Sequence, residues 1–279
     1  MNQEVFAALA QALEEGEPAA LVTIVATTGS TPQRVGAKML VFGDGRTVGT
    51  IGGGCYENDA FWKAREALTH RRPQVVKYEL SDDFAQETGL ICGGQMEVYI
   101  EPVEPSPELY VIGAGHVGFH LARLAHDVGF RVHVVDDREK FASRERFPDA
   151  AEVVVEDIPA WIARTTLPPH VYVVIVTRGH TNDLEALRGL ASRDLRYLGL
   201  IGSRAKVVRI YDALTEAGIP AQMLARVHAP IGLDIGAVTP QEIAVSILGE
   251  IIAVKHGKLK ARDAAELSMR WNNLKTPVV

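Results

Sequence analysis

The feature that most constrains the fold is a glycine-rich turn, GAGHVG at residues 113–118, which follows an apolar predicted strand and opens a predicted helix. The next predicted strand, residues 131–135, ends at Asp136, which lies 23 residues beyond the first glycine of the turn. In dinucleotide-binding folds an acid ~20 residues after that glycine contacts the ribose. Strand, turn, helix and acid together predict a Rossmann-type domain.

Each position in the turn has a physical role. Gly113 permits the tight turn, Gly115 lets the backbone approach a phosphate, and Gly118 lets the helix pack closely on the strand. The helix start offers free N–H groups and a partial positive charge, which suit an anion, and His116 could contact it. We expect a phosphate-bearing, nucleotide-like ligand here, with a purely structural turn as the alternative. At the ribose of such a ligand, Asp136 would contact a hydroxyl group. Alternatively, Arg138 would contact a 2′-phosphate.

Strand and helix patterns alternate through the rest of the second half of the chain, which predicts a doubly wound parallel sheet. Residues 101–108 (EPVEPSPE) carry three prolines and three acids and indicate a linker. We therefore expect a smaller N-terminal α/β domain at 1–103, which carries the cysteines, and a Rossmann-like domain at 104–279. A hairpin is predicted around residues 43–45.

Two further polar clusters follow predicted strands of the second domain, where open α/β sheets bind ligands. The first is TRGH at 177–180, with Arg178 and His180, and the second is GSRAK at 202–206, with Ser203 and Arg204. Both could add contacts to an anion. The alternative is that they are solvated loop residues that begin helices.

The least ordinary segment is the run of glycines before the first cysteine, Gly52, Gly53, Gly54 and Cys55. Consecutive glycines expose bare backbone N–H groups to an oxyanion or a flat ring. A cysteine near a helix start favours the thiolate, which is a nucleophile and a metal ligand. Cys92 also lies beside paired glycines. If both cysteines line one cleft, they could hold a soft or transition metal, pass sulfur, or form a reversible disulfide. The alternative for each is a buried structural cysteine.

Composition excludes several classes of protein. The hydrophobic fraction of 47% and charged fraction of 23% are those of a globular chain. A net charge of −6 gives no overall attraction for nucleic acid. No apolar run approaches the ~20 residues of a membrane helix, and the first residues lack a secretory signal. Two cysteines in 279 residues fit a reducing cytoplasm.

Seven short motifs together resemble those of the XdhC/CoxI family of xanthine dehydrogenase accessory proteins. They are ATTGSTP (26–32), GTIGGGC (49–55), CGG (92–94), GAGHVG (113–118), TRGH (177–180), IGSRAK (201–206) and PIGLDIG (230–236). The resemblance covers nearly the whole chain.

The resemblance implies a cytoplasmic, dimeric chaperone for the molybdenum cofactor, molybdopterin, without turnover of its own. Such a protein binds the cofactor, aids its sulfuration with a cysteine desulfurase, and delivers it to an apo-molybdenum hydroxylase of the xanthine dehydrogenase type. By the same resemblance Cys55 and Cys92 would be the cofactor-side cysteines and possible molybdenum contacts.

Two other functions compete with this one. An NAD(P)-dependent oxidoreductase would account for the glycine turn and Asp136. However, the sequence shows no residue at a fixed spacing that is a convincing proton donor. A redox regulator would sense a nucleotide and switch through Cys55 and Cys92.

Overall fold

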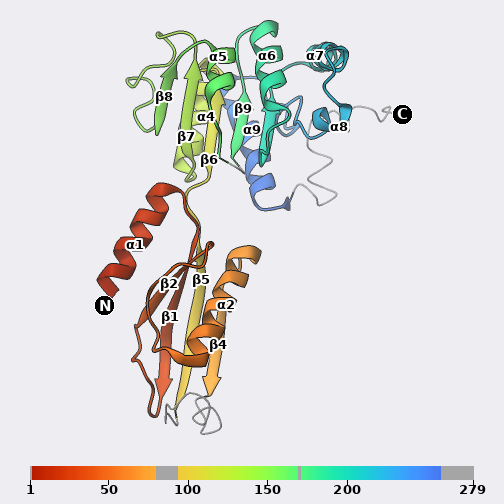
Figure 1. Ribbon diagram of the computed structural model, residues 1–279. Coiled ribbons are helices and arrows are strands. Elements are labelled where there is room, and N and C mark those ends of the chain that lie inside the picture. The colour runs from red at the N-terminus through yellow and green to blue at the C-terminus, as the bar shows by residue number, and fades with distance from the viewer. Residues whose placement is uncertain (1, 80–93, 169–170, 259–279) are drawn as a thin grey trace. The chain divides into compact units, whose positions relative to one another are not determined.

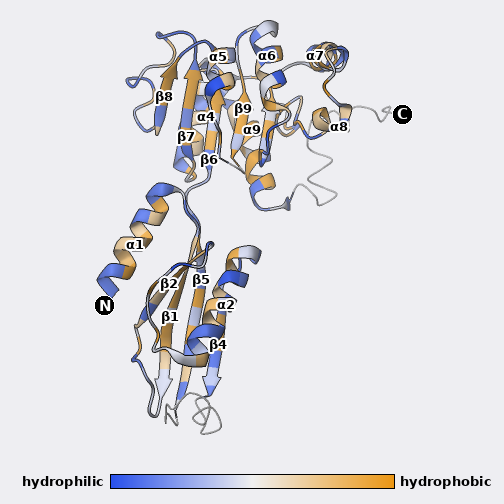
Figure 2. Ribbon diagram, in the orientation of Figure 1, coloured by the Kyte–Doolittle hydropathy of each residue, from blue (hydrophilic) through white to orange (hydrophobic). Residues whose placement is uncertain are grey.

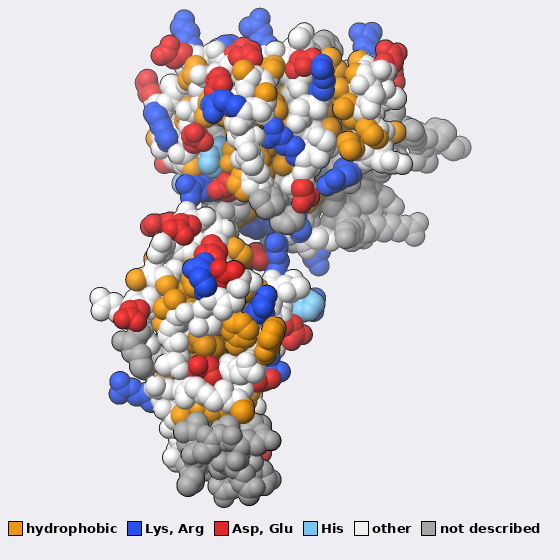
Figure 3. Space-filling view, viewed as in Figure 1, with side chains coloured by type: hydrophobic (Ala, Val, Ile, Leu, Met, Phe, Trp, Pro, Cys, Tyr) orange, Lys and Arg blue, Asp and Glu red, His pale blue; other side chains and the backbone are white. Residues whose placement is uncertain are grey.

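A computed structural model describes residues 2–79, 94–168 and 171–258 of the chain (Figure 1). The chain folds as two units, Met1–Ser106 and Pro107–Val279. Within the described ranges, no helix has the length and hydropathy needed to cross a bilayer. Acidic and basic side chains are interspersed on the visible face of each unit (Figure 3).

An antiparallel sheet in the order β3-β2-β1-β5-β4 forms the frame of the N-terminal unit. Its strands are β1 (Ala19–Thr28), β2 (Lys38–Phe42), β3 (Thr47–Gly49), β4 (Gln74–Glu79) and β5 (Gln95–Val103). The predicted hairpin is confirmed, because β2 pairs with β3 and the Gly45 N–H donates to the Phe42 carbonyl across the turn. β5 ends at Val103 and the next strand begins at Glu108, so residues 104–107 of the predicted linker separate the two strands.

Each face of this sheet is covered by one helix. Successive side chains of a strand point to opposite faces, so β1 contributes to two separate cores. The hydrophobic core between the sheet and α2 (Gly54–His70) contains Ala20, Val22 and Ile24. The core on the opposite face, between the sheet and α1 (Asn2–Glu15), contains Leu21. The α2 face is lined by three buried alanines, Ala60, Ala64 and Ala67. Their small side chains let the helix lie close to the sheet.

Five parallel strands form the C-terminal unit, in the order β10-β9-β6-β7-β8. They are β6 (Glu108–Ile112), β7 (Arg131–Asp136), β8 (Glu152–Val155), β9 (Tyr172–Ile175) and β10 (Tyr197–Leu200). The first strand, β6, lies at the centre; the chain adds β7 and β8 on one side and then crosses to add β9 and β10 on the other. This is the doubly wound arrangement that the sequence predicted. Open α/β sheets bind ligands outside the carboxyl ends of their strands where the strand order reverses, which in this sheet is between β6 and β9.

Helices cover both faces of the parallel sheet, and the hydrophobic residues of the strands lie between them (Figure 2). One face carries α4 (His116–Asp127) and α9 (Pro240–Lys255). The other carries α5 (Ile158–Arg164), α6 (His180–Leu190), α7 (Arg204–Glu216) and the short α8 (Ala221–Leu224). A capping box begins α9, since Thr239 Oγ1 accepts from the Glu242 N–H and Glu242 accepts from the Thr239 N–H.

The start of α2 is fixed by a single carboxylate. Glu57 Oε2 accepts hydrogen bonds from the Thr50 hydroxyl at 2.5 Å and from the backbone N–H groups of Ile51, Gly52 and Gly53 at 2.8, 3.1 and 3.0 Å. Burial acts to raise the pKa of Glu57, but these hydrogen bonds outweigh it, so the pKa lies below its usual value of 4.5. The ionised form therefore stabilises the folded segment.

Replacing Glu57 by glutamine should loosen the segment that precedes α2. The stabilisation from a lowered carboxyl pKa is complete above about pH 4.5 and is lost as the pH falls through the folded-state value. At pH 7 we expect Glu57→Gln to lower the local opening free energy at the Ile51–Gly53 amides by about 1 kcal/mol, and this difference should shrink below pH 4. Amide hydrogen exchange at both pH values measures it.

The matched control is Glu66→Gln, because Glu66 is an exposed carboxylate on the same helix. It should leave exchange of the Ile51–Gly53 amides unchanged. A Glu57→Gln effect of equal size at pH 7 and pH 3 would show that the charge of Glu57 does not hold the segment.

Candidate functional site

Sequence motifs of the N-terminal unit that lie far apart in the chain come together in space. A Cβ placed on Gly52 would lie 3.0 Å from the Pro32 ring, so the glycine run packs against the 26–32 segment, which comprises the end of β1 and the loop after it. A Cβ on Gly94 would lie 2.4 Å from the Ser30 carbonyl oxygen and 2.5 Å from that of Thr28. Only glycine fits at position 94, because the chain passes directly against the same segment.

Cys55 lies on this motif cluster. It is the second residue of α2, is exposed, and is a free cysteine. The prediction that it stands at a helix start is confirmed. Cys92, its predicted partner, lies outside the described residues, but Gly94, two positions on, reaches the 26–32 segment that also contacts Gly52. That the two cysteines share a cleft stays a prediction.

The three glycines have positive φ angles, as a glycine-rich turn predicts, but the N–H groups of two of them already have a hydrogen-bond acceptor in the protein. Gly52, Gly53 and Gly54 have φ of 126°, 75° and 79°, values that side chains disfavour. The N–H groups of Gly52 and Gly53, expected to face a ligand, donate instead to Glu57. The sequence analysis missed Glu57. Glu57 stands four residues after Gly53, one turn into the helix, and this spacing indicates that its side chain can reach the glycine N–H groups.

The glycine turn of the C-terminal unit matches its predicted geometry. Gly113 has φ of 115°, and a Cβ there would lie 2.5 Å from the Val176 carbonyl oxygen. A Cβ on Gly118 would lie 1.9 Å from the Gly113 carbonyl oxygen, so α4 packs directly on the turn. At Gly115 a Cβ would meet nothing within 4 Å. This is the open position at which a phosphate was expected.

Asp136 is a structural residue of the turn. Its side chain is 2% exposed. Oδ2 accepts from the Ala114 N–H at 2.7 Å and from Arg138 Nη2 at 2.9 Å, and Oδ1 accepts from the Arg138 N–H at 3.0 Å and Nε at 2.8 Å. Burial would raise the pKa of Asp136, but the Arg138 and Ala114 hydrogen bonds hold it below its usual value. That Asp136 contacts a ribose stays a prediction; in this structure both of its oxygens accept from protein donors.

The loop between β7 and β8 braces the same turn. Its Arg146 donates from Nη1 to the Ala114 carbonyl at 3.0 Å, while the Ala114 N–H donates to Asp136. The backbone N–H of Ala114 is therefore bound by a side chain at the end of β7, and its carbonyl by a side chain of the loop that follows β7. This bracing fixes the backbone of the turn before any ligand arrives.

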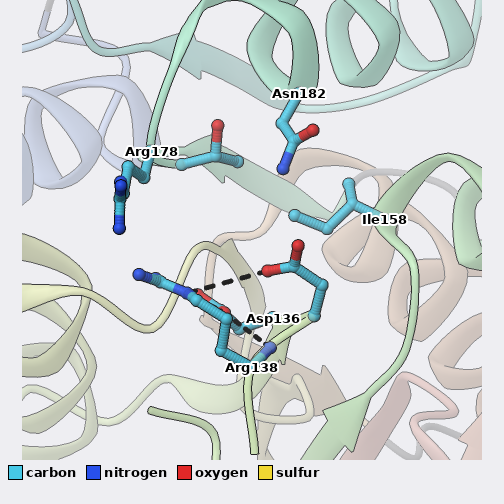
Figure 4. A pocket seen from close by; sticks show the side chains of 7 residues that line it. Asp136, Arg138, Ile158, Arg178 and Asn182 are labelled. Atoms are coloured by element: carbon cyan, nitrogen blue, oxygen red, sulfur yellow. Dashed lines mark hydrogen bonds and ion pairs between the residues drawn. The ribbon is translucent and has the colours of Figure 1, made fainter.

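A pocket of about 220 Å³ opens at the carboxyl edge of the sheet (Figure 4). It is lined by Asp136, Asp137, Arg138, Ile158, Thr177, Arg178 and Asn182. The structure thus brings the predicted residues Asp136 and Arg178 together, one from the end of β7 and one from beyond β9. Sequence reasoning missed Asp137, Ile158 and Asn182, since no spacing rule placed them.

The two strand-end clusters are joined by a buried ion pair. Lys206, from the GSRAK motif, pairs with Asp183 on α6, and Asp183 accepts from the Thr177 hydroxyl at 2.5 Å. Ser203 caps α7 by accepting from the Lys206 N–H. The helix-starting alternative therefore holds for Ser203, while ligand contacts stay predictions.

The remaining predicted residues stand at helix starts. Arg204 is the exposed first residue of α7, and His116 is the exposed first residue of α4. His180 begins α6. Among the residues that the structure describes, no three His, Cys, Asp or Glu side chains form a metal-binding group. That Cys55 contacts molybdenum stays a prediction.

The PIGLDIG motif is held by α9. Buried Glu250 accepts from the Gly232 N–H at 3.0 Å and from the Tyr197 hydroxyl at 2.6 Å, and His228 Nδ1 lies 3.2 Å from it. Ser246 donates to the Leu233 carbonyl at 2.6 Å. A buried carboxylate thus ties the motif to β10.

Comparison with known proteins identifies both halves of the chain. Residues 12–79 match the model of the XdhC and CoxI family, and residues 109–251 match the XdhC Rossmann domain. The uncharacterized protein YqeB of Escherichia coli (strain K12) is 38% identical over 90% of this chain, which spans 46% of that relative, about half of its length.

Two further relatives match over most of their own length. The molybdenum cofactor insertion chaperone PaoD of Escherichia coli (strain K12) is 24% identical over 88% of this chain and 86% of its own. A solved structure from Bacillus halodurans, titled a xanthine dehydrogenase, is 25% identical with a TM-score of 0.51, over 92% of this chain and 98% of that one. The predicted resemblance is confirmed: the chain belongs to the XdhC and CoxI family, and its C-terminal unit is an XdhC Rossmann domain.

Proposed function

We propose that this protein binds the molybdenum cofactor, aids its sulfuration and inserts it into a molybdenum hydroxylase of the xanthine dehydrogenase type. The family and the names of the relatives support an accessory or insertion role. The observation that carries the proposal is Cys55, an exposed free thiol on a cluster of family motifs.

The residues present fit the chemistry of this group. Molybdopterin supplies a molybdenum atom on dithiolene sulfurs and a phosphate. A cysteine sulfur is a suitable further contact for such a soft centre. In this chain Cys55 has its thiol exposed at a helix start, and Glu57 fixes the backbone on which it stands. Cys55 would hold and orient the metal end, with Cys92 as the second thiol.

The C-terminal unit offers a separate site for an anion, which we propose binds the phosphate of a nucleotide. The open Gly115 and the start of α4 offer backbone N–H groups and a partial positive charge. His116 begins this helix, and Arg178 lines the neighbouring pocket. These residues, with His180, Ser203 and Arg204 at other helix starts on the carboxyl side of the sheet, form our proposed anion-binding set.

The partners follow from the proposed role. An apo-molybdenum hydroxylase would receive the cofactor, a cysteine desulfurase would supply the sulfur, and the accessory protein would act as a homodimer in the cytoplasm. The name of PaoD, an insertion chaperone, supports the first of these.

Replacing Cys55 by alanine should separate cofactor handling from folding. Alanine is a good helix former and leaves the Glu57 contacts in place, so the fold should persist. Retention of sulfurated molybdopterin should fall by ~10-fold or more, as expected for a lost metal contact. Activation of an apo-hydroxylase should fall further. Anaerobic loading, followed by pterin analysis and recovered hydroxylase activity, measures both.

Asn58→Ala is the matched control, because Asn58 is exposed on the same helix. It should load and deliver cofactor like the parent. Cys92→Ala should act like Cys55→Ala, and the double variant should lose less than the sum of the two losses if the thiols share a cleft. Full delivery by Cys55→Ala at unchanged cofactor occupancy would remove Cys55 from the site.

The oxidoreductase alternative is favoured by one observation, the nucleotide-type glycine turn beside a pocket. We nevertheless expect no more than trace oxidation or reduction of small substrates with NAD(P)H. Steady-state assays of the purified protein at 340 nm, across carbonyl and hydroxy-acid substrates, test this. Saturable hydride transfer at ordinary turnover would reverse the ranking of the two functions.

A further inference from the structure

We propose that His133 forms a proton-dependent clamp at the amino edge of the parallel sheet, which binds Glu152 in both charge states of the ring and Glu108 only when the ring is protonated. The clamp would hold the start of β6 more firmly as the pH falls through the range in which histidine changes charge. This inference concerns the C-terminal unit alone and does not depend on cofactor binding or on Cys55.

His133 lies on the middle one of three neighbouring strands, with a carboxylate on each side of its ring. It is on β7, where its register partners are Tyr110 on β6 and Glu152 on β8. Its Nδ1 lies 3.4 Å from Glu152 Oε2, and its Nε2 lies 3.6 Å from Glu108 Oε2. Glu108 is the first residue of β6 and Glu152 the first of β8, so the three side chains connect the amino ends of three strands.

The imidazole of His133 is buried, and one of its nitrogens has no partner. The side chain is 10% exposed and stacks on Tyr110, with ring centroids 4.4 Å apart. Nε2 makes no hydrogen bond with any described residue, because 3.6 Å is beyond hydrogen-bonding distance. A buried polar atom without a partner costs free energy. A further contact at this nitrogen would therefore stabilise the cluster.

The charge of the ring decides whether that contact can form. A neutral imidazole carries one N–H, whereas an imidazolium carries two. When Nδ1 donates to Glu152, the Nε2 of a neutral ring turns a lone pair toward the carboxylate of Glu108, which repels it. Protonation puts a hydrogen on Nε2, and a shift of about 1 Å or less would then bring Glu108 to the ~2.8 Å of a charge-assisted hydrogen bond.

Tyr110 keeps Glu108 in a position to accept this hydrogen bond. The Tyr110 hydroxyl donates to Glu108 Oε2 at 3.1 Å. Burial, together with the charge of Glu108, raises the pKa of Tyr110, so the hydroxyl stays protonated wherever histidine changes charge. A carboxylate oxygen has two lone pairs, which leaves Glu108 Oε2 able to accept from His133 as well.

The other charged groups around the ring do not cancel the effect of the carboxylates. Arg131, two residues before His133, lies on the same face of β7. Arg164 on α5 acts on the charge of Glu152, but its Nε also donates to Glu156 at 2.9 Å. Three carboxylates, Glu156 and the two of the clamp, therefore stand against two arginines, and this balance favours the imidazolium.

Two backbone amides report on the two arms of the clamp. The Arg131 N–H donates to the Pro107 carbonyl beside β6, and the Ala151 N–H donates to the Val132 carbonyl beside β8. Amide exchange of the full chain, corrected for the intrinsic rate at each pH, gives a protection factor for each amide. From about pH 8 to about pH 5.5, protection of Arg131 should rise ~10-fold, because a hydrogen bond to a charged group forms. Protection of Ala151 should rise less, since the Glu152 contact exists in both states.

Variants separate the charge of the ring from its packing. His133→Gln keeps a polar side chain but cannot become a cation, so the rise at Arg131 should disappear. Glu108→Gln leaves the ring in place and removes the charge that it would bind, so the rise should fall to ~3-fold or less. The matched control is His126→Gln, because His126 is an exposed histidine 3.9 Å from Asp127. This control should keep the full rise.

Nitrogen NMR of the histidine rings is a second measurement, which needs no variant to fold. In the parent, His133 should carry a hydrogen on both ring nitrogens at about pH 5.5 and on Nδ1 alone at about pH 8. A ring that stays neutral at the lower pH overturns the proposal. So does a rise at Arg131 that is undiminished in either His133→Gln or Glu108→Gln, or a rise at Ala151 as large as that at Arg131.

Discussion

Backbone N–H groups at a tight glycine turn need an acceptor, and in both units a carboxylate supplies it. Glu57 gathers the N–H groups of Ile51, Gly52 and Gly53, and Asp136 takes that of Ala114. Buried donors without partners are rare because each one costs free energy. The two turns can therefore be rigid in the absence of a ligand, and each helix start is fixed by its own unit.

The regular parts of the fold could be predicted from the sequence because local patterns determine them. The strand Arg131–Asp136 and the hairpin of β2 and β3 lie where their apolar residues and the glycine-containing turn predicted them. The tight packing at Gly113 and Gly118 also follows from the motif, since each glycine occupies a place where a Cβ would meet a carbonyl oxygen.

The details of the sites could not be predicted in this way, because they depend on which side chain satisfies which backbone group. The spacing placed Asp136 near a ribose, but it could not show that Arg138, two residues on, also pairs with that carboxylate. Asp137, the next residue, lines the same pocket, and no spacing rule distinguishes the two positions. The contact between Gly94 and Ser30 likewise joins residues distant in sequence.

The carboxylate of Glu57 occupies the position that a bound anion would take at this turn. Being attached four residues from the turn, it is present there at the high effective concentration of an intramolecular ligand. A free phosphate or sulfate that entered the turn would have to compete with this tethered group and would gain little. A ligand can prevail only if it makes additional contacts, for example through a sulfur-bound metal beside Cys55. The turn before α2 therefore favours a ligand that makes further contacts with this chain over a small free anion.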